Sequence, residues 1–317
     1  MPSSHHRRLV PRAPCLVVDP DSITEEGRTV LVDAKGECFT CDIKPLGSNS
    51  SFSLTWKGWI LSWNLNDART FLYDPLSSEE IDLPHFAHHQ LPSRFVCALS
   101  EKPTSNGRGC IVVILHPDKP CLWYCRVGGD EWIKYDYDVG SQPADPACLT
   151  WEKTVISSLT SCKGKFYYPV SGVRLAVIEF NPSPATHVVR MGGMPRGYWA
   201  RDCYFELDEE PYQFYAFMDD SSIITGFTLY KIDTVSQRFT KVDEIGDRAL
   251  LWSGHNGRCC PASRFGLEPN SVYWISPEDD SSIHIFNIVE STERVCDHPS
   301  KDLPKLSSKA FWLLPAN

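Results

Sequence analysis

Residues 227–242 read FTLYKIDTVSQRFTKV, and this stretch decides the fold class because its pattern is that of a β-hairpin. Apolar and polar residues alternate on both sides of a polar turn, which is typical of two antiparallel strands. The same pattern recurs at residues 70–84, 121–135, 174–190 and 282–297. The central residues of the five hairpins, Tyr73, Tyr124, Ile178, Tyr230 and Phe286, are separated by 51, 54, 52 and 56 positions. The chain therefore repeats one supersecondary unit.

Each hairpin follows a further strand-like run. These runs are residues 58–64, 109–117, 164–170, 212–218 and 270–276. Weaker apolar runs, such as residues 93–100, precede some of them. Three or four strands per repeat of roughly fifty residues are typical of a β-propeller blade with a kelch-like period.

The two ends of the chain supply the remaining strands. Residues 14–20, 27–34 and 37–45 form three strands, one short of a blade, and residues 309–317 form one more. Because an unpaired sheet edge invites aggregation, we expect the C-terminal strand to pair with the N-terminal blade and close the ring. The sequence thus predicts an all-β fold with a single propeller domain over residues 14–317, six blades in preference to seven, and a disordered basic arm at residues 1–13.

Composition and charge argue against some classes of function. A net charge of −9 argues against sequence-independent binding of nucleic acid, which needs a positive field. No apolar run reaches the roughly 18 residues that a membrane span requires. The 13 cysteines lie mostly in apolar strand patterns, and residues 1–14 lack the apolar core of a secretory signal. We therefore expect reduced thiols, a cytoplasmic or nuclear location, and a monomer.

Several segments resemble a plant propeller family associated with F-box proteins, the KIB-type family. Residues 58–84, GWILSWNLNDARTFLYDPLSSEEIDLP, resemble its early signature. Residues 227–265 resemble its best-marked stretch, in which a Gly-Asp-Arg-Ala-Leu core precedes a strand ending in Pro-Ala-Ser. Residues 267–276 and the closing AFWLLP resemble the tail of the family.

This resemblance implies a kelch-like propeller that, in members with an F-box, is the substrate receptor of a ubiquitin ligase. The F-box would be a helical segment before the propeller, and residues 1–13 are too few to form it. We therefore expect a client protein as the partner, and we do not expect binding to the ligase adaptor.

Motifs for catalysis or metal binding are missing from the sequence. It has no GxSxG, HExxH, GxxxxGK[ST] or GxGxxG string, so no catalytic residue and no cofactor is predicted. Cys38 and Cys41 form a CxxC, but in a strand positions i and i+3 point to opposite faces. The histidines of residues 85–89 occupy a Pro-flanked loop without a carboxylate, so no metal is predicted either.

Two segments are candidates for a site. Residues 191–202, MGGMPRGYWARD, read as a loop, and its Arg196, Tyr198, Trp199 and Arg201 are residue types enriched at binding hot spots. Alternatively, Tyr198 and Trp199 begin the next blade and are buried.

The second segment contains Gly246, Asp247 and Arg248. Gly246 permits a turn, and Asp247 with Arg248 can form an ion pair or cap backbone groups. We interpret the three residues as a structural clasp between blades in preference to a binding site.

The sequence therefore favours a non-catalytic propeller that binds a client protein through loops on one face. The alternative is an enzyme, a hydrolase or lyase, with acidic, histidine or metal-binding groups that converge at the mouth of the central channel. A folded propeller without a binding role is a third alternative. The sequence names neither the client nor the face that binds it.

Overall fold

The computed structural model describes most of the chain. The described residues are 12–19, 29–41, 43–46, 50–55, 57–64, 66–86, 95–104, 109–143, 150–157, 159–171, 173–193, 200–221, 223–254, 257–275, 282–296, 307 and 309–315. They contain 27 β-strands and one four-residue helix. Of the N-terminal arm predicted at residues 1–13, only residues 12 and 13 are among them.

The described residues group into two compact units. Unit 1 comprises residues 1–48, 74–79 and 244–317, and unit 2 comprises residues 49–73 and 80–243. Each unit is built from sheets of four or five strands, with one additional two-stranded sheet in unit 2.

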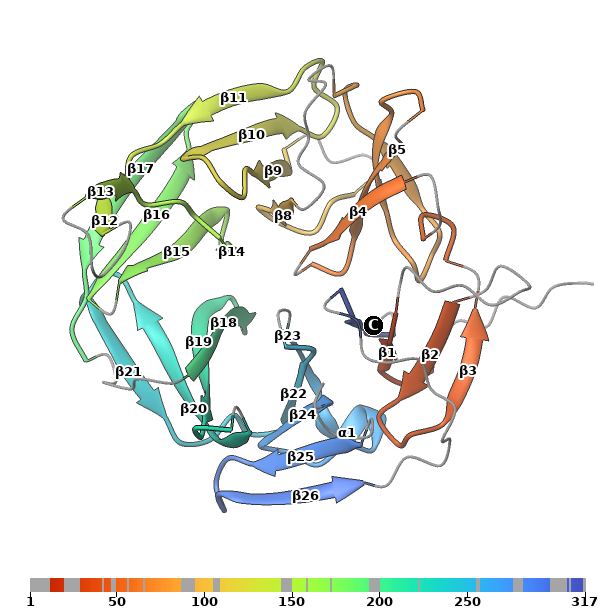
Figure 1. Cartoon of the computed structure of the whole chain (residues 1–317). Coiled ribbons are helices and arrows are strands. Elements are labelled where there is room, and N and C mark those ends of the chain that lie inside the picture. The colour runs from red at the N-terminus through yellow and green to blue at the C-terminus, as the bar shows by residue number, and fades with distance from the viewer. Residues whose placement is uncertain are drawn as a thin grey trace, which may run out of the picture. The chain divides into compact units, whose positions relative to one another are not determined.

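Unit 2 holds four sheets whose strands follow one another in chain order (Figure 1). The first contains β4 (Ser50–Leu54), β5 (Ile60–Asn64), β6 (Thr70–Tyr73) and β7 (Glu80–Asp82). The second contains β8 (Val96–Leu99), β9 (Ile111–Leu115), β10 (Cys121–Arg126) and β11 (Ile133–Asp136). The third contains β14 (Thr160–Cys162), β15 (Lys165–Ser171), β16 (Arg174–Phe180) and β17 (Pro184–Arg190). The fourth contains β18 (Ala200–Leu207), β19 (Glu210–Met218), β20 (Ile224–Asp233) and β21 (Arg238–Val242).

Unit 1 holds two sheets. One consists of β27 (Phe311–Leu313), β1 (Cys15–Val17), β2 (Thr29–Asp33) and β3 (Cys38–Cys41), in that order. The C-terminal strand β27 pairs antiparallel with β1, with Leu16 opposite Trp312. The other sheet has the order β23 (Gly257–Pro261), β22 (Arg248–Trp252), β24 (Ser271–Ile275), β25 (Ile283–Asn287) and β26 (Thr292–Cys296).

The last sheet corrects one expectation, since the sequence texture indicated antiparallel strands throughout. Strand β22 pairs parallel with β24, with Leu250 opposite Val272. Between them the chain turns back along β22 as β23 and then forms the short helix α1 (Ala262–Phe265). A return strand and a helix provide the connection that two parallel neighbours require.

The core of each unit forms between its sheets. In unit 1, side chains from β1, β22, β24 and β27 share one cluster, and Trp252, Trp274 and Trp312 are almost fully buried. In unit 2, Trp59, Leu72, Val112 and Trp123 belong to one cluster of the first two sheets. Burial of apolar surface at about 25 cal/mol per Å² is the main force that holds such sheets together.

The cysteines behave as packed apolar residues. None of the twelve that the structure describes is in a disulfide, and eight of them are buried. Burial raises the pKa of the Cys97 and Cys203 thiols well above the usual range, so both are neutral at physiological pH. Neutral buried thiols are poor nucleophiles. Cys38 and Cys41 lie in strand β3, as the sequence predicted.

No helix in the described part of the chain is both long and apolar enough to cross a membrane.

Candidate interaction surface

Unit 2 has two opposite edges, because the turns of an antiparallel sheet alternate between its ends. The turns β4–β5, β14–β15 and β18–β19 share one edge, here called the hairpin edge. Cys162, the last residue of β14 before the second of these turns, donates its thiol hydrogen to the carbonyl of Glu209 in the third turn, over 3.0 Å. Lys57 in the first turn is ion-paired with Glu206 at the end of β18. These contacts place the three turns together.

The acidic run Asp208-Glu209-Glu210 lies at the hairpin edge. Its first two residues, Asp208 and Glu209, are exposed. Glu210, however, is half-buried and lies 3.4 Å from Lys163 and 3.9 Å from Lys231. Part of this charge is therefore used in ion pairs between neighbouring strands and sheets of unit 2.

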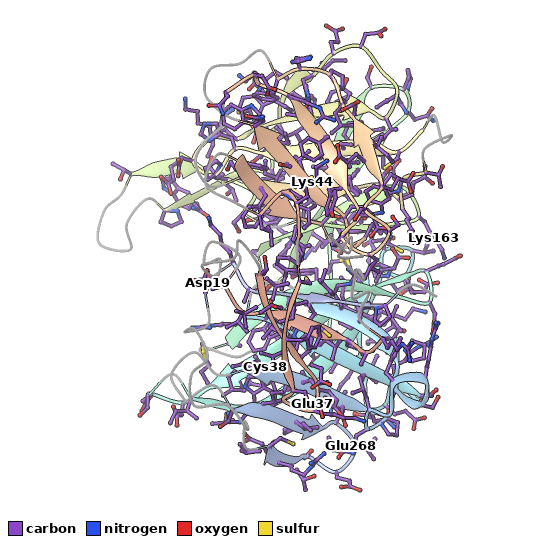
Figure 2. All side chains as sticks on the ribbon, turned by 90° about the vertical axis from the view of Figure 1, so that its right-hand side faces the viewer. Asp19, Glu37, Cys38, Lys44, Lys163 and Glu268 are labelled. Carbon is purple, nitrogen blue, oxygen red and sulfur yellow. The ribbon has the colours of Figure 1, made fainter. Side chains whose placement is uncertain are left out.

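The opposite edge of unit 2 carries an extra two-stranded sheet and is here called the insertion edge. Strands β12 (Ser141–Pro143) and β13 (Trp151–Lys153) pair antiparallel between the second and third sheets of the unit. Every side chain of both strands is exposed, and Trp151 is 68% exposed. In Figure 2 this hairpin projects away from the body of unit 2, on the side opposite to Lys163.

Two more exposed apolar side chains lie at the insertion edge. Val173, in the turn between β15 and β16, is 52% exposed, and Ile223, just before β20, is 58% exposed. The polar groups around Ile223 are ordered, since its backbone N–H and that of Ser221 both donate to the Asp219 carboxylate. Single exposed apolar residues are common on proteins, but an exposed tryptophan is a frequent anchor in protein interfaces.

The loop predicted to bind a partner starts at Met191, whose N–H donates to the carbonyl of Val173 over 2.8 Å, and Gly192 then reaches the turn between β20 and β21. Arg196, Tyr198 and Trp199 lie outside the described residues. Arg201 is described, and it is half-buried in β18, the first strand of the fourth sheet of the unit.

The start of that loop is held by backbone contacts. Gly192 donates its N–H to the carbonyl of Gln237 over 2.8 Å, and Phe239 donates to the carbonyl of Gly192 over 2.7 Å. Gly193 adopts a φ of +83°, and a Cβ there would lie 2.5 Å from the Phe239 carbonyl oxygen. Only glycine fits this position.

A polar cluster lies just inside the insertion edge, on the face of the fourth sheet that packs toward the third. Gln213 is fully buried, and its Nε2 donates to the Asp202 carboxylate over 3.1 Å and to the Tyr204 hydroxyl. The Oε1 of Gln213 and the hydroxyl of Tyr215 are also buried in this cluster, where the two side chains interact. Sequence inspection missed this cluster because its members come from two strands.

The segment Gly246-Asp247-Arg248 ties β22 to helix α1. The Asp247 carboxylate accepts hydrogen bonds from the Ser263 N–H over 2.8 Å and from its hydroxyl over 2.5 Å. These bonds hold the pKa of Asp247 below its usual value. The carbonyl of Gly246 accepts from the backbone of Asn270. These contacts lie within the last sheet, where they fix the return of the chain from β23 to β24.

Groups for metal binding or catalysis are not clustered in the described part of the chain. No set of three or more His, Cys, Asp or Glu side chains there is arranged to hold a metal ion. His85 is exposed, and His88 and His89 lie outside the described residues.

A half-buried arginine is the most unusual charge of unit 1. Arg258 lies on β23, the innermost strand of the last sheet, and burial lowers its pKa to about 10. Among the residues that the structure describes it makes no ion pair, although Asp74 is close enough to raise its pKa.

Comparison with known proteins identifies the family. A family model described as KIB1-4 beta-propeller matches residues 30–287, and the chain belongs to this family. The fold is accordingly an all-β propeller, and its six blades are the six sheets of four or five strands. No curated protein matches the chain.

Two solved structures are similar at low sequence identity. The β-propeller domain of Cps50 (Swd1) from Myceliophteria thermophila is 11% identical, with a TM-score of 0.41, over 88% of this chain and 86% of that one. The dihydro-heme d1 dehydrogenase NirN, in complex with DHE, is 10% identical, with a TM-score of 0.37. The match covers 93% of this chain and 75% of the NirN chain.

Proposed function

We propose that this propeller is a non-catalytic interaction module that binds a client protein through the insertion edge of unit 2. The observation that carries the proposal is Trp151, 68% exposed on a hairpin that is added to the regular four-stranded sheets. Covering an exposed aromatic ring with a partner surface removes apolar area from water, and this contributes favourable free energy to binding.

The surroundings of Trp151 support the proposal. Val173 and Ile223 add apolar area at the same edge, and the loop predicted to bind a partner starts beside Val173. Rigid sheets that present variable turns are a common basis for protein recognition. The resemblance to F-box-associated propellers suggests the same role, that of a client receptor. The free cysteines fit a reducing compartment, so we place the protein in the cytoplasm or nucleus.

Catalysis is the second candidate function, and the described residues give it less support. The buried thiols have raised pKa values, and carboxylates and histidines do not cluster. Nothing about the described part of the chain favours a particular reaction.

A quantitative affinity capture tests the proposal. Tagged wild-type protein and the variants Trp151→Ala and Val235→Ala are used as baits in the same extract, and recovered proteins are measured by mass spectrometry. Val235 is 94% exposed in the turn between β20 and β21, at the hairpin edge, so it is a matched control for loss of an exposed apolar side chain. We expect Trp151→Ala to reduce client recovery at least about fivefold, or about 1 kcal/mol in binding, and Val235→Ala to leave it unchanged. Equal recovery with all three baits would contradict the proposal.

A further inference from the structure

Asp202 is a carboxylate that is fixed in position and exposed to solvent. It is the third residue of β18 and lies opposite Tyr215 on β19. Its carboxylate accepts from Gln213 Nε2, and Gln213 is itself immobilised because it is fully buried and also bonded to Tyr204. Preorganised groups bind ligands well because little conformational entropy is lost.

The negative charge of Asp202 is not balanced. Among the residues that the structure describes, no lysine, arginine or histidine forms an ion pair with it. Some exposed aspartates of unit 2 do have such partners: Asp136 lies 2.8 Å from Lys134, and Asp243 lies 2.9 Å from Lys241. Asp202 therefore differs from them in using a neutral amide to hold its carboxylate.

The surroundings of Asp202 suit a cation. Burial is the largest cause of the raised pKa of Tyr168, Tyr204 and Tyr215. The negative charge of Asp202 raises the pKa of each of them further. Three phenol rings from two neighbouring sheets thus lie within electrostatic reach of the carboxylate. A carboxylate accepts charge-assisted hydrogen bonds from ammonium and guanidinium groups.

The described residues of the insertion edge include further acidic side chains. Its turns carry four more exposed aspartates, Asp67, Asp118, Asp219 and Asp220. Three of its described cations are engaged: Arg69 lies 2.6 Å from Asp82, Lys153 lies 3.4 Å from Asp138, and Arg174 donates to the Val139 carbonyl over 3.1 Å.

Three cations at this edge have no ion pair with the described residues, namely Lys119, Arg190 and Arg201. Five carboxylates, with Asp202 included, outnumber them. Charge complementarity therefore favours a basic partner surface.

We propose that Asp202 is the anchoring point for a lysine or arginine side chain of the client protein. This inference rests on the proposed function and adds the chemistry of the partner: a basic side chain flanked by apolar residues that cover Trp151, Val173 and Ile223.

Fluorescence polarisation with defined peptides tests the inference. The probe is a short fluorescein-labelled peptide in which arginine and leucine alternate, and the matched probe has citrulline in place of arginine. Citrulline keeps the shape of arginine but has no charge. We expect wild-type protein to bind the arginine peptide at least about tenfold more tightly than the citrulline peptide.

Three variants test whether the arginine peptide binds at Asp202. Asp202→Asn should weaken binding of the arginine peptide about tenfold, and Asp202→Glu should retain most of it, since the charge is kept. Asp208→Asn makes the same charge change at the hairpin edge and should leave binding within about twofold of wild type. Thermal melts of all three variants check that each is folded.

Two results would overturn the inference: equal binding of the arginine and citrulline peptides, or wild-type affinity in Asp202→Asn. Either result leaves the proposed function standing if Trp151→Ala still loses the client. If Trp151→Ala keeps the client, the proposed function fails independently of the peptide result.

Discussion

Lys57 and Glu206 form an ion pair although 149 positions separate them in the sequence. Lys57 belongs to the first sheet of unit 2 and Glu206 to the fourth, and the two side chains are only 17% and 27% exposed. The pair therefore ties the ends of the unit together at its hairpin edge.

We expect Lys57→Met to lower the free energy of unfolding by about 1–2 kcal/mol, because it leaves the half-buried Glu206 carboxylate without its counter-ion. The double variant Lys57→Met/Glu206→Gln should be more stable than Lys57→Met alone, since no unpaired charge remains. Urea unfolding followed by tryptophan fluorescence measures both. The control is Lys165→Met, which breaks the exposed pair with Glu179 and should cost no more than about 0.5 kcal/mol. Similar losses in the two single variants would contradict a special role for Lys57.

Gly193 should not tolerate a side chain. We expect Gly193→Ala to destabilise the protein by about 2 kcal/mol or more, because its Cβ would meet the Phe239 carbonyl oxygen and its φ is positive. Gly164→Ala separates the two causes, since Gly164 has a φ of +75° but open space around it. We expect Gly164→Ala to lower the free energy of unfolding by about 1 kcal/mol. If the two variants melt alike, the contact with Phe239 is unimportant.

Replacing Glu209 with glycine should stabilise the protein. Asp208 and Glu209 form a two-residue turn with φ values of 48° and 60°, a conformation that favours glycine at the second position. The equivalent turn between β14 and β15 has Gly164 there. We expect Glu209→Gly to raise the free energy of unfolding by about 0.5–1 kcal/mol. A loss of stability in chemical denaturation would show that the Glu209 side chain makes a favourable contact.

The hairpin repeat was predictable from sequence because each anchor residue is buried in the strand before the outermost one. Tyr73, Tyr124, Ile178 and Tyr230 lie in β6, β10, β16 and β20 with exposures of 0–8%. Alternation of apolar and polar residues in such strands follows directly from burial of one face.

The candidate site was less predictable, because its residues are not part of a repeated pattern of apolar and polar positions. Trp151 stands alone between polar neighbours, so no strand pattern marks β13. Asp202 gains its setting from Gln213 and Tyr204, which the strand register, and not the local sequence, brings together. The parallel pair β22–β24 was also missed, since the turn-back of β23 is indistinguishable from an ordinary hairpin by its pattern.

Asp247 should make stability depend on pH. Hydrogen bonds from Ser263 lower its pKa in the folded protein, so its contribution is present above the ordinary carboxyl pKa of 3.8 and is lost as the pH falls through the lower, folded value. The difference in Tm between wild type and Asp247→Ala should therefore be largest near neutral pH and shrink below about pH 4. A difference that does not change between pH 7 and pH 3 would show that Asp247 acts without its charge.

Arg258 offers a test of buried charge in unit 1. It is half-buried, and the described residues supply no ion pair. We expect Arg258→Met to raise the free energy of unfolding by about 1 kcal/mol, because methionine keeps the length of the side chain and removes the desolvated charge. A marked loss of stability would indicate that the guanidinium has a favourable partner.

Photo-crosslinking tests the central claim most directly, namely that a client binds the insertion edge. A photoreactive phenylalanine analogue is placed at Ile223 in one variant and at Val235 in another, at the two opposite ends of β20. After irradiation in extract, crosslinked products are identified by mass spectrometry. The account predicts one defined product from position 223, lost when Trp151→Ala is added, and none from position 235. The same product from both positions, or a product from position 235 alone, would contradict it.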